Sequence, residues 1–188
     1  MYILEQDQSS TPYAALYYQQ PEDYLEFFNY PGGASYNITK LSENRWRDPA
    51  AWIHYVIKCD TTAATAADRT RVYANGAEII YRTDTNISQN TDTGWNKATA
   101  MRIGGTATVS GRDFNGYLAE FHHVDGTALD PTSFGEYDDN GVWRPIEANI
   151  SSYGTNGFYL KFDPSATNGI GHDHSGNGNN FTPSGFTT

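Results

Sequence analysis

Side-chain oxygens recur at every second residue close to the C-terminal end of the sequence, at Asp173, Ser175, Asn177 and Asn179. Two glycines stand between them and allow the chain to bend tightly. Calcium is a hard cation that takes oxygen ligands from loops of this kind. An ordinary polar turn has the same composition, because Asn and Gly favour turns for conformational reasons alone. The string therefore predicts either a calcium site formed by these four side chains or a polar turn.

Three aromatic residues are candidates for ligand binding: Trp95, Tyr153 and Trp143. Trp95 lies in the string Thr-Gly-Trp-Asn-Lys, which is typical of a loop. A Trp or Tyr on a loop offers a flat ring and a polar tip, which suits contacts with sugars or with other proteins. Such residues also serve to cap hydrophobic cores. We expect these three to contribute to a binding surface, with core packing as the alternative.

The histidines do not form a recognisable catalytic or metal-binding set. His54 lies in an apolar run and is expected to be buried and hydrogen-bonded within a sheet. His122 and His123 are neighbours in a predicted strand, so their side chains point to opposite faces. His172 and His174 share one side of an extended chain, but a zinc site needs more ligands than these two.

Composition restricts the class of protein. The 188 residues carry a formal net charge of −10, and an acidic surface repels the phosphate backbone of nucleic acids. A single cysteine, Cys59, cannot form an internal disulfide, so stability must come from burial of the 38% of residues that are hydrophobic. No apolar run approaches the length needed to cross a membrane, and the first residues do not resemble a secretory signal. We therefore expect neither nucleic-acid binding nor membrane insertion.

Short apolar or alternating runs, separated by Gly, Asn, Asp and Pro, predict an all-β fold. Asn75-Gly76 between two alternating runs predicts a tight hairpin. Asp130 and Pro131 have the residue types of a helix cap and a first helical residue, so they could open a short helix. The predicted strands are residues 14–19, 24–30, 34–39, 52–60, 69–74, 77–84, 100–104, 116–124 and 157–162.

Several strings occur in the order found in one family. Trp52-Ile-His-Tyr-Val-Ile-Lys-Cys-Asp, followed by Arg71-Val-Tyr-Ala-Asn-Gly, resembles the W-x-H-x-x-x-x-x-D … R-x-Y-x-N-G pattern of LamG and concanavalin A-like lectin/glucanase domains. Met101-Arg-Ile-Gly-Gly and Phe114-Asn-Gly-Tyr-Leu-Ala-Glu-Phe resemble later segments of that family. The series from Asp125 to Phe181 is similar to the segment that comes after such a domain in bacteriophage tail-fibre and other virion appendage proteins.

The resemblance implies an antiparallel β-sandwich of the jelly-roll, concanavalin A/LamG-like kind. It implies a LamG-like sandwich over residues 1–126, and an extension over residues 127–188 that packs on the sandwich or begins a second unit. Such domains carry further strands before the point where Met1 falls, so the sandwich is expected to be incomplete at its N-terminus. A longer protein, another chain or the C-terminal segment could each supply the missing strands.

The expected function is that of a virion structural or appendage protein, a tail fibre or similar, acting in host-surface attachment or particle assembly. A stand-alone carbohydrate-binding lectin module is the alternative, and a glycan hydrolase is a third. Hydrolases of this family carry Glu-x-Asp-x-x-Glu, and the nearest string here, Glu5-Gln-Asp-Gln-Ser, lacks the second Glu. We therefore expect no enzyme activity. The expected partners are further copies of the chain in a homo-oligomer such as a trimer, other virion proteins and a cell-surface glycan.

Overall fold

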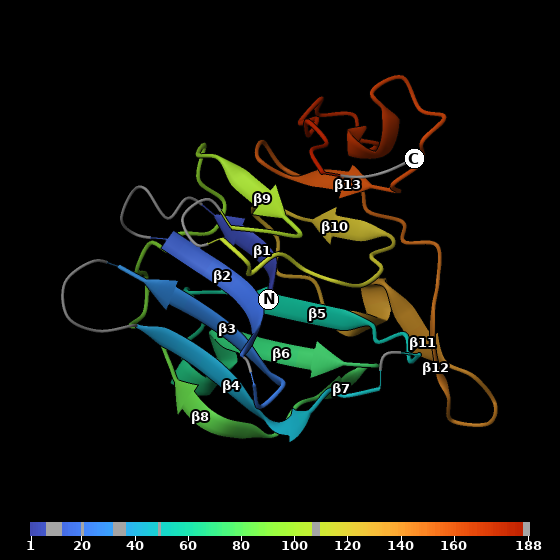
Figure 1. The fold of residues 1–188 in the computed structure, drawn as a ribbon. Helices are drawn as coiled ribbons and strands as arrows, with labels where there is room; N and C mark the ends of the chain where they lie inside the picture. Colours follow the sequence, from blue (N-terminus) through green and yellow to red (C-terminus); the bar gives the residue numbers. More distant parts are fainter. Residues whose placement is uncertain (7–12, 20, 32–36, 49, 107–109, 186–188) are drawn as a thin grey trace. The chain divides into compact units, whose positions relative to one another are not determined.

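The computed structural model describes residues 1–6, 13–19, 21–31, 37–48, 50–106 and 110–185. The chain divides into two compact units (Figure 1). The first unit comprises Met1–Asn115 and Asp130–Ala148, and the second comprises Gly116–Leu129 and Asn149–Thr188. The boundary predicted after residue 126 falls within the first segment of the second unit.

The first unit contains a six-stranded antiparallel sheet with the strand order β8-β4-β3-β2-β1-β9. Apolar and aromatic residues dominate its central strands β2 and β3, which favours a pleated surface that is largely buried. The strands are β1 (Tyr2–Gln6), β2 (Tyr13–Gln19), β3 (Tyr24–Tyr30), β4 (Ile38–Arg45), β8 (Tyr81–Thr85) and β9 (Met101–Ile103).

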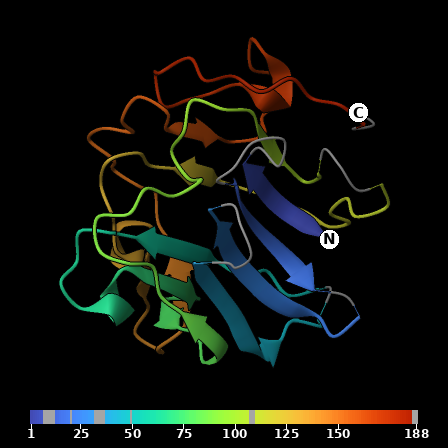
Figure 2. The ribbon, with the colours of Figure 1, turned by 90° about the vertical axis from the view of Figure 1, so that its left-hand side faces the viewer.

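A three-stranded antiparallel sheet forms the second layer of this unit (Figure 2). Its strands are β5 (Tyr55–Cys59), β6 (Thr70–Ala74) and β7 (Ala77–Glu78). The hydroxyls of Tyr18 in β2 and Tyr55 in β5 lie 3.0 Å apart, and the Tyr81 hydroxyl in β8 accepts a hydrogen bond from the Val72 amide in β6 (2.8 Å). These contacts join one face of the large sheet to the small sheet, so the first unit is a two-layer sandwich.

The predicted hairpin is confirmed. Strands β6 and β7 pair across Asn75 and Gly76, whose φ angles of 49° and 79° are both left-handed. This is the conformation that makes an Asn-Gly pair match the twist of the two strands. The Asn75 side chain also accepts a hydrogen bond from the His54 amide (2.9 Å), which places the chain entering β5 beside the turn.

The remaining elements of the first unit are short. Strands β11 (Gly135–Tyr137) and β12 (Trp143–Pro145) pair in a hairpin, and η1 (Ala66–Asp68) and η2 (Pro131–Ser133) are single 3₁₀ turns. Asp130 and Pro131 open η2 as predicted, but the Asp130 carboxylate forms an ion pair with Lys58 (2.7 Å) and no side-chain cap. Within the described residues, no helix is long and apolar enough to span a membrane.

The second unit is built on strands β10 (Phe121–His123) and β13 (Phe158–Leu160), with η3 (Gly169–Gly171) after them. The two strands are antiparallel, with His122 opposite Tyr159 and His123 opposite Phe158. His122 stacks on Tyr159 (4.1 Å between ring centroids), whereas His123 stacks on Phe158 (5.1 Å). The prediction that the two histidines point to opposite faces is therefore confirmed.

The all-β class and the antiparallel sandwich are confirmed, while the jelly-roll connectivity stays a prediction. Three predicted strands need correction. The run 52–60 is a strand only from Tyr55, and the Trp52 side chain is 66% exposed. The run 77–84 is interrupted at Ile79 and Ile80, where the chain passes from the three-stranded to the six-stranded sheet. The run 116–124 becomes a strand only at Phe121, because Glu120 has a left-handed φ of 51°.

A fourth predicted strand, 34–39, lies partly outside the described residues, and the observed strand β4 begins at Ile38.

Candidate functional site: an aromatic sheet face

One face of the six-stranded sheet is lined with aromatic side chains, and we call it the aromatic face. It is the face opposite the one that carries Tyr18 and meets the small sheet. Strand register creates it: Tyr13 lies opposite Tyr30, Ala15 opposite Phe28 and Tyr17 opposite Glu26. Side chains alternate along a strand, so these residues share a face. Its aromatic members are Tyr2, Tyr13, Tyr17, Phe28 and Tyr30.

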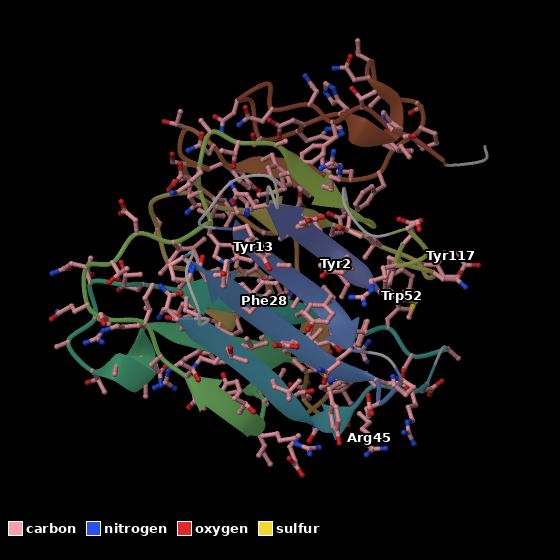
Figure 3. All side chains as sticks on the ribbon, turned by 60° about the vertical axis from the view of Figure 1, so that its left-hand side comes forward. Tyr2, Tyr13, Phe28, Arg45, Trp52 and Tyr117 are labelled. Carbon is pink, nitrogen blue, oxygen red and sulfur yellow. The ribbon has the colours of Figure 1, made fainter. Side chains whose placement is uncertain are left out.

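The rings of the aromatic face contact one another continuously. Tyr2 stacks on Tyr17 (5.0 Å between centroids), and the rings of Tyr17 and Tyr13 are nearly perpendicular to Phe28, with centroids 5.7 Å and 5.5 Å from its own. Tyr13 also contacts Tyr30 (5.2 Å). Tyr2 and Phe28 are buried, whereas the other three tyrosines are only partly buried around them. Figure 3 shows Tyr2, Tyr13 and Phe28 gathered over strands β1 to β3.

A carboxyl group belongs to the same face. The Tyr17 hydroxyl donates a hydrogen bond to Glu26. Burial raises the pKa of Glu26, and the hydrogen bond from Tyr17 offsets part of that rise. Burial also raises the pKa of the Tyr2 phenol, against the nearby positive charge of Arg112. The face therefore combines flat rings, phenol hydroxyls and a partly desolvated carboxyl group.

The ladder places a second carboxyl group on this face. Glu5 in β1 lies opposite Ala15, and Arg102 in β9 lies opposite Glu5. Strand β2 lies between the strands of Glu5 and Glu26, and the two residues are offset by two positions along the ladder, which places their Cα atoms roughly 12 Å apart. Glu5 is fully buried, with 1% of its surface exposed. Sequence reasoning misses this pair because the two residues lie on strands that only the fold brings together.

Trp95, predicted to bind a ligand, lies elsewhere. Its indole stacks on Phe27 (5.0 Å, rings 12° from parallel), and Phe27 belongs to the face opposite the aromatic face. The preceding Gly94 amide donates a hydrogen bond to the buried Asn29 side chain (2.5 Å). The loop that carries Trp95 is thus attached to β3, and its ring does not join the tyrosines.

Trp143, also predicted to bind a ligand, packs on the hairpin turn. A Cβ atom on Gly76 would lie 2.2 Å from the indole, and one on Gly135 would lie 2.4 Å from it. The indole N–H donates a hydrogen bond to His54 Nδ1 (2.9 Å), so this nitrogen carries no proton and His54 is neutral. Burial lowers the pKa of His54, which favours the same neutral form. His54 is half-buried and bonds to Trp143.

Replacing Gly76 with alanine should lower the free energy of unfolding by about 3 kcal/mol, because a side chain at φ 79° is strained and would also displace the Trp143 ring. Gly141→Ala is the matched control, since Gly141 has φ 75° with open space around it. It should cost only about 1 kcal/mol. Urea unfolding measures both, and equal losses would show that the indole does not pack on the turn.

Tyr153, the third predicted ligand-binding residue, belongs to the second unit. Its hydroxyl lies 2.7 Å from His122 Nδ1, and its ring is parallel to those of His122 and Tyr159. The Tyr159 hydroxyl in turn donates a hydrogen bond to Glu120. Burial raises the pKa of Tyr153 to about 12, so its phenol stays protonated at neutral pH. The structure does not bring Trp95 and Trp143 together, and Tyr153 lies in a separate unit.

The predicted calcium ligands form a hydrogen-bonded loop. Both oxygens of Asp173 accept bonds from the protein: Oδ1 from the amides of Tyr159 (2.9 Å) and Ser175 (2.8 Å), Oδ2 from the Ser175 hydroxyl (2.9 Å) and the Asn179 amide (2.8 Å). Burial alone would raise the pKa of Asp173, but these hydrogen bonds hold it below its usual value. The carboxylate therefore has its acceptor positions occupied.

The two asparagines of this loop present donors. The side-chain NH₂ groups of Asn177 and Asn179 both donate to the Gly157 carbonyl (2.8 Å each), and they also bond to the carbonyls of Gly154 and Thr155. These hydrogen bonds are those of a polar turn, the alternative reading of this string, and the calcium site stays a prediction. Among the described residues, no group of three His, Cys, Asp or Glu side chains is placed to hold a metal ion.

No protein-family model, curated protein or solved structure matches this chain.

Proposed function

We propose that this chain is a non-catalytic attachment module that binds a glycan through the aromatic face and serves in a bacteriophage virion appendage such as a tail fibre. The stacked tyrosines beside Glu26 are the observation that carries the binding function. The virion setting is supported by the order of sequence strings that resembles phage appendage proteins.

The chemistry of the aromatic face favours a neutral glycan. The apolar C–H face of a sugar ring packs on Tyr, while phenol hydroxyls and carboxyl oxygens bond to sugar hydroxyls. The net charge of −10 and the carboxyl group of Glu26 disfavour sulfated or phosphorylated glycans. Among neutral glycans, the identity of the sugar would be set by which hydroxyls reach Glu26 and the tyrosines.

We propose further that the module acts in a homo-oligomer. Strands β8 and β9 are the outer strands of the six-stranded sheet, and an outer strand leaves backbone hydrogen-bonding groups for a neighbour. Several copies presented together would also strengthen a sugar contact that is weak for each copy, because the second contact becomes intramolecular.

Binding to an array of neutral glycans tests the proposed site. Tyr13→Ala should weaken binding about tenfold or more, because it removes one stacking ring at a partly buried position. Tyr17→Phe keeps the ring and removes the bond to Glu26, so a smaller loss is expected. Trp52→Ala is the matched control, since Trp52 is exposed and lies outside the aromatic face.

Two outcomes would contradict the proposal. If Trp95→Ala abolished binding while Tyr13→Ala did not, the site would lie on the opposite side of β3. If the glycan were cleaved, and Glu26→Gln stopped the cleavage, Glu26 would be a catalytic carboxyl group, and hydrolysis would replace simple binding.

A further inference from the structure

Lys40 is a lysine buried inside the sandwich. It lies in the middle of β4, its residue exposure is 1%, and it is the largest fully buried side chain among the described residues. Its partner in the ladder is Asp84 in β8, and Phe27 in β3 lies on its other side. Lysine is almost never fully buried unless it is paired, so its surroundings require a chemical explanation.

Two side chains from the segment at β8 meet the Lys40 amine. Nζ contacts the Asp84 carboxylate and lies 2.8 Å from Asn86 Oδ1. Asp84 and Asn86 are two residues apart, so an extended chain turns them to the same side. The Tyr81 ring lies 4.8 Å from Nζ and helps to enclose it. A primary amine, an amide and a carboxyl group thus meet at one point, where Lys40 is buried and the Asp84 side chain is 41% exposed.

We propose that Lys40 and Asn86 form an intramolecular isopeptide bond, with Asp84 as the group that transfers the protons. The inference goes beyond glycan binding, because Lys40 pairs with Phe27 and so lies on the face of the sheet opposite the aromatic face. Asp84, the ladder partner of Lys40, holds a base beside the buried amine, and the Asn86 carbonyl lies within hydrogen-bonding distance of it. This arrangement supplies the proximity that such a condensation needs.

The reaction balances without an added reagent. Asp84 takes one proton from the Lys40 ammonium, and the lone pair of the neutral Nζ attacks Asn86 Cγ to form a C–N bond. The carbonyl electrons move to Oδ1, which accepts a hydrogen bond from the protonated Asp84. A proton then passes from Nζ through Asp84 to Asn86 Nδ2, the Cγ–Nδ2 bond breaks and ammonia leaves. The ammonia takes the remaining proton from Asp84 and departs as ammonium, and no atom is oxidised or reduced.

The bond would join β4 to the residue that follows the outer strand β8, across 46 positions of the sequence. A cross-link of this span limits the unfolded chain and stabilises the fold, as a disulfide does. It would be insensitive to reducing agents, and it would hold an outer strand of the sheet in place.

The mass of the intact, denatured full-length chain tests the proposal. The wild-type protein should be lighter than its sequence by the mass of one ammonia. After trypsin digestion, a branched peptide should contain residues 40 and 86, with no cleavage after Lys40 because its amine is acylated. A wild-type mass equal to that of the sequence would overturn the proposal.

Variants assign the bond. Lys40→Met, Asn86→Ala and Asp84→Asn should each restore the full mass expected for the variant, whereas Lys58→Met should still lack one ammonia. Lys58 is the matched control because it also pairs with an aspartate, Asp130, at 2.7 Å, but with its side chain 24% exposed. The mass can be measured on unfolded protein, so it can be determined even for a variant that folds poorly. The wild-type mass tests the proposal whether or not the variants fold.

Two other losses are distinguishable. Asn75-Gly76 could lose ammonia by closing a cyclic imide, and such a loss would persist in Lys40→Met, which would overturn the proposal. Loss of water that persists in Asn86→Ala would place the bond at Asp84, which would overturn the assignment to Asn86. If the bond forms as proposed, the melting temperature of Asn86→Ala should fall by roughly 10 °C relative to the wild type.

Discussion

Replacing Asp173 with alanine is expected to unfold the second unit while leaving the sandwich of the first unit intact. The substitution removes a carboxylate that accepts four hydrogen bonds, two of them from residues outside its own turn, Tyr159 and Asn179. Asp173 is 5% exposed, so water would not replace these bonds fully. We expect a loss of roughly 4 kcal/mol, a large part of the stability of a unit this small.

Hydrogen exchange followed by mass spectrometry measures this loss in the full chain. Peptides covering β10 and β13 should lose protection in Asp173→Ala, whereas peptides covering β3 should keep it. Asp163→Ala is the matched control, because Asp163 makes the same local bonds to the amide and hydroxyl of a serine two residues on, Ser165, without bonds to a strand. It should reduce protection by no more than about 1 kcal/mol.

The same experiment separates the hydrogen-bonded loop from a calcium site. If the four hydrogen bonds to Asp173 hold the loop by themselves, adding calcium or a chelator to the wild type should leave the protection of β13 unchanged. If protection instead rose with calcium and fell with the chelator, the result would support the predicted calcium site at Asp173, Ser175, Asn177 and Asn179.

Local sequence rules predict some elements of this fold closely. The run 24–30 corresponds to β3 at both ends, because aromatic residues with β propensity are bounded by a turn on one side and Pro31 on the other. The Asn75-Gly76 turn follows from backbone conformation alone. Strand β1 is different: its five residues are all buried, including Glu5 and Gln6, so no alternation marks it.

The candidate sites depend on contacts between distant segments. Tyr17 and Glu26 meet because β2 and β3 have a particular register, and Lys40 is buried because Asp84 lies opposite it across a ladder between β4 and β8. A lone lysine in a sequence is normally placed on the surface. Likewise, the sequence around Trp143 is rich in polar residues and glycine, as surface loops are, and only the fold places the indole over two glycines. Residue type indicates what chemistry a side chain could do, but the pairing of strands decides which residues it contacts.

Lowering the pH should destabilise the second unit before its carboxylates are protonated, because His123 gains a proton on unfolding. Its ring stacks on Phe158 on the inner face of the β10–β13 pair, and burial lowers its pKa from 6.5 to about 4. Between these values the unfolded chain binds a proton at His123 that the folded chain does not. The stability contributed by the neutral ring is therefore complete above pH 6.5 and is lost progressively as the pH falls towards 4, by as much as roughly 3 kcal/mol.

Two measurements on the full chain check this expectation. An NMR titration should show the His123 imidazole gaining its proton near pH 4, far below an ordinary histidine. Hydrogen exchange of β13 should accelerate between pH 6.5 and 4.5, after correction for the intrinsic rate, and His123→Phe should remove most of that acceleration because Phe keeps the stack on Phe158 without a titrating group. His172→Asn, which also removes an imidazole from this unit, should retain it. If both variants behaved like the wild type, protonation of His123 would not be what weakens the unit in acid, and the inner face of β10 and β13 would have to admit water to the ring.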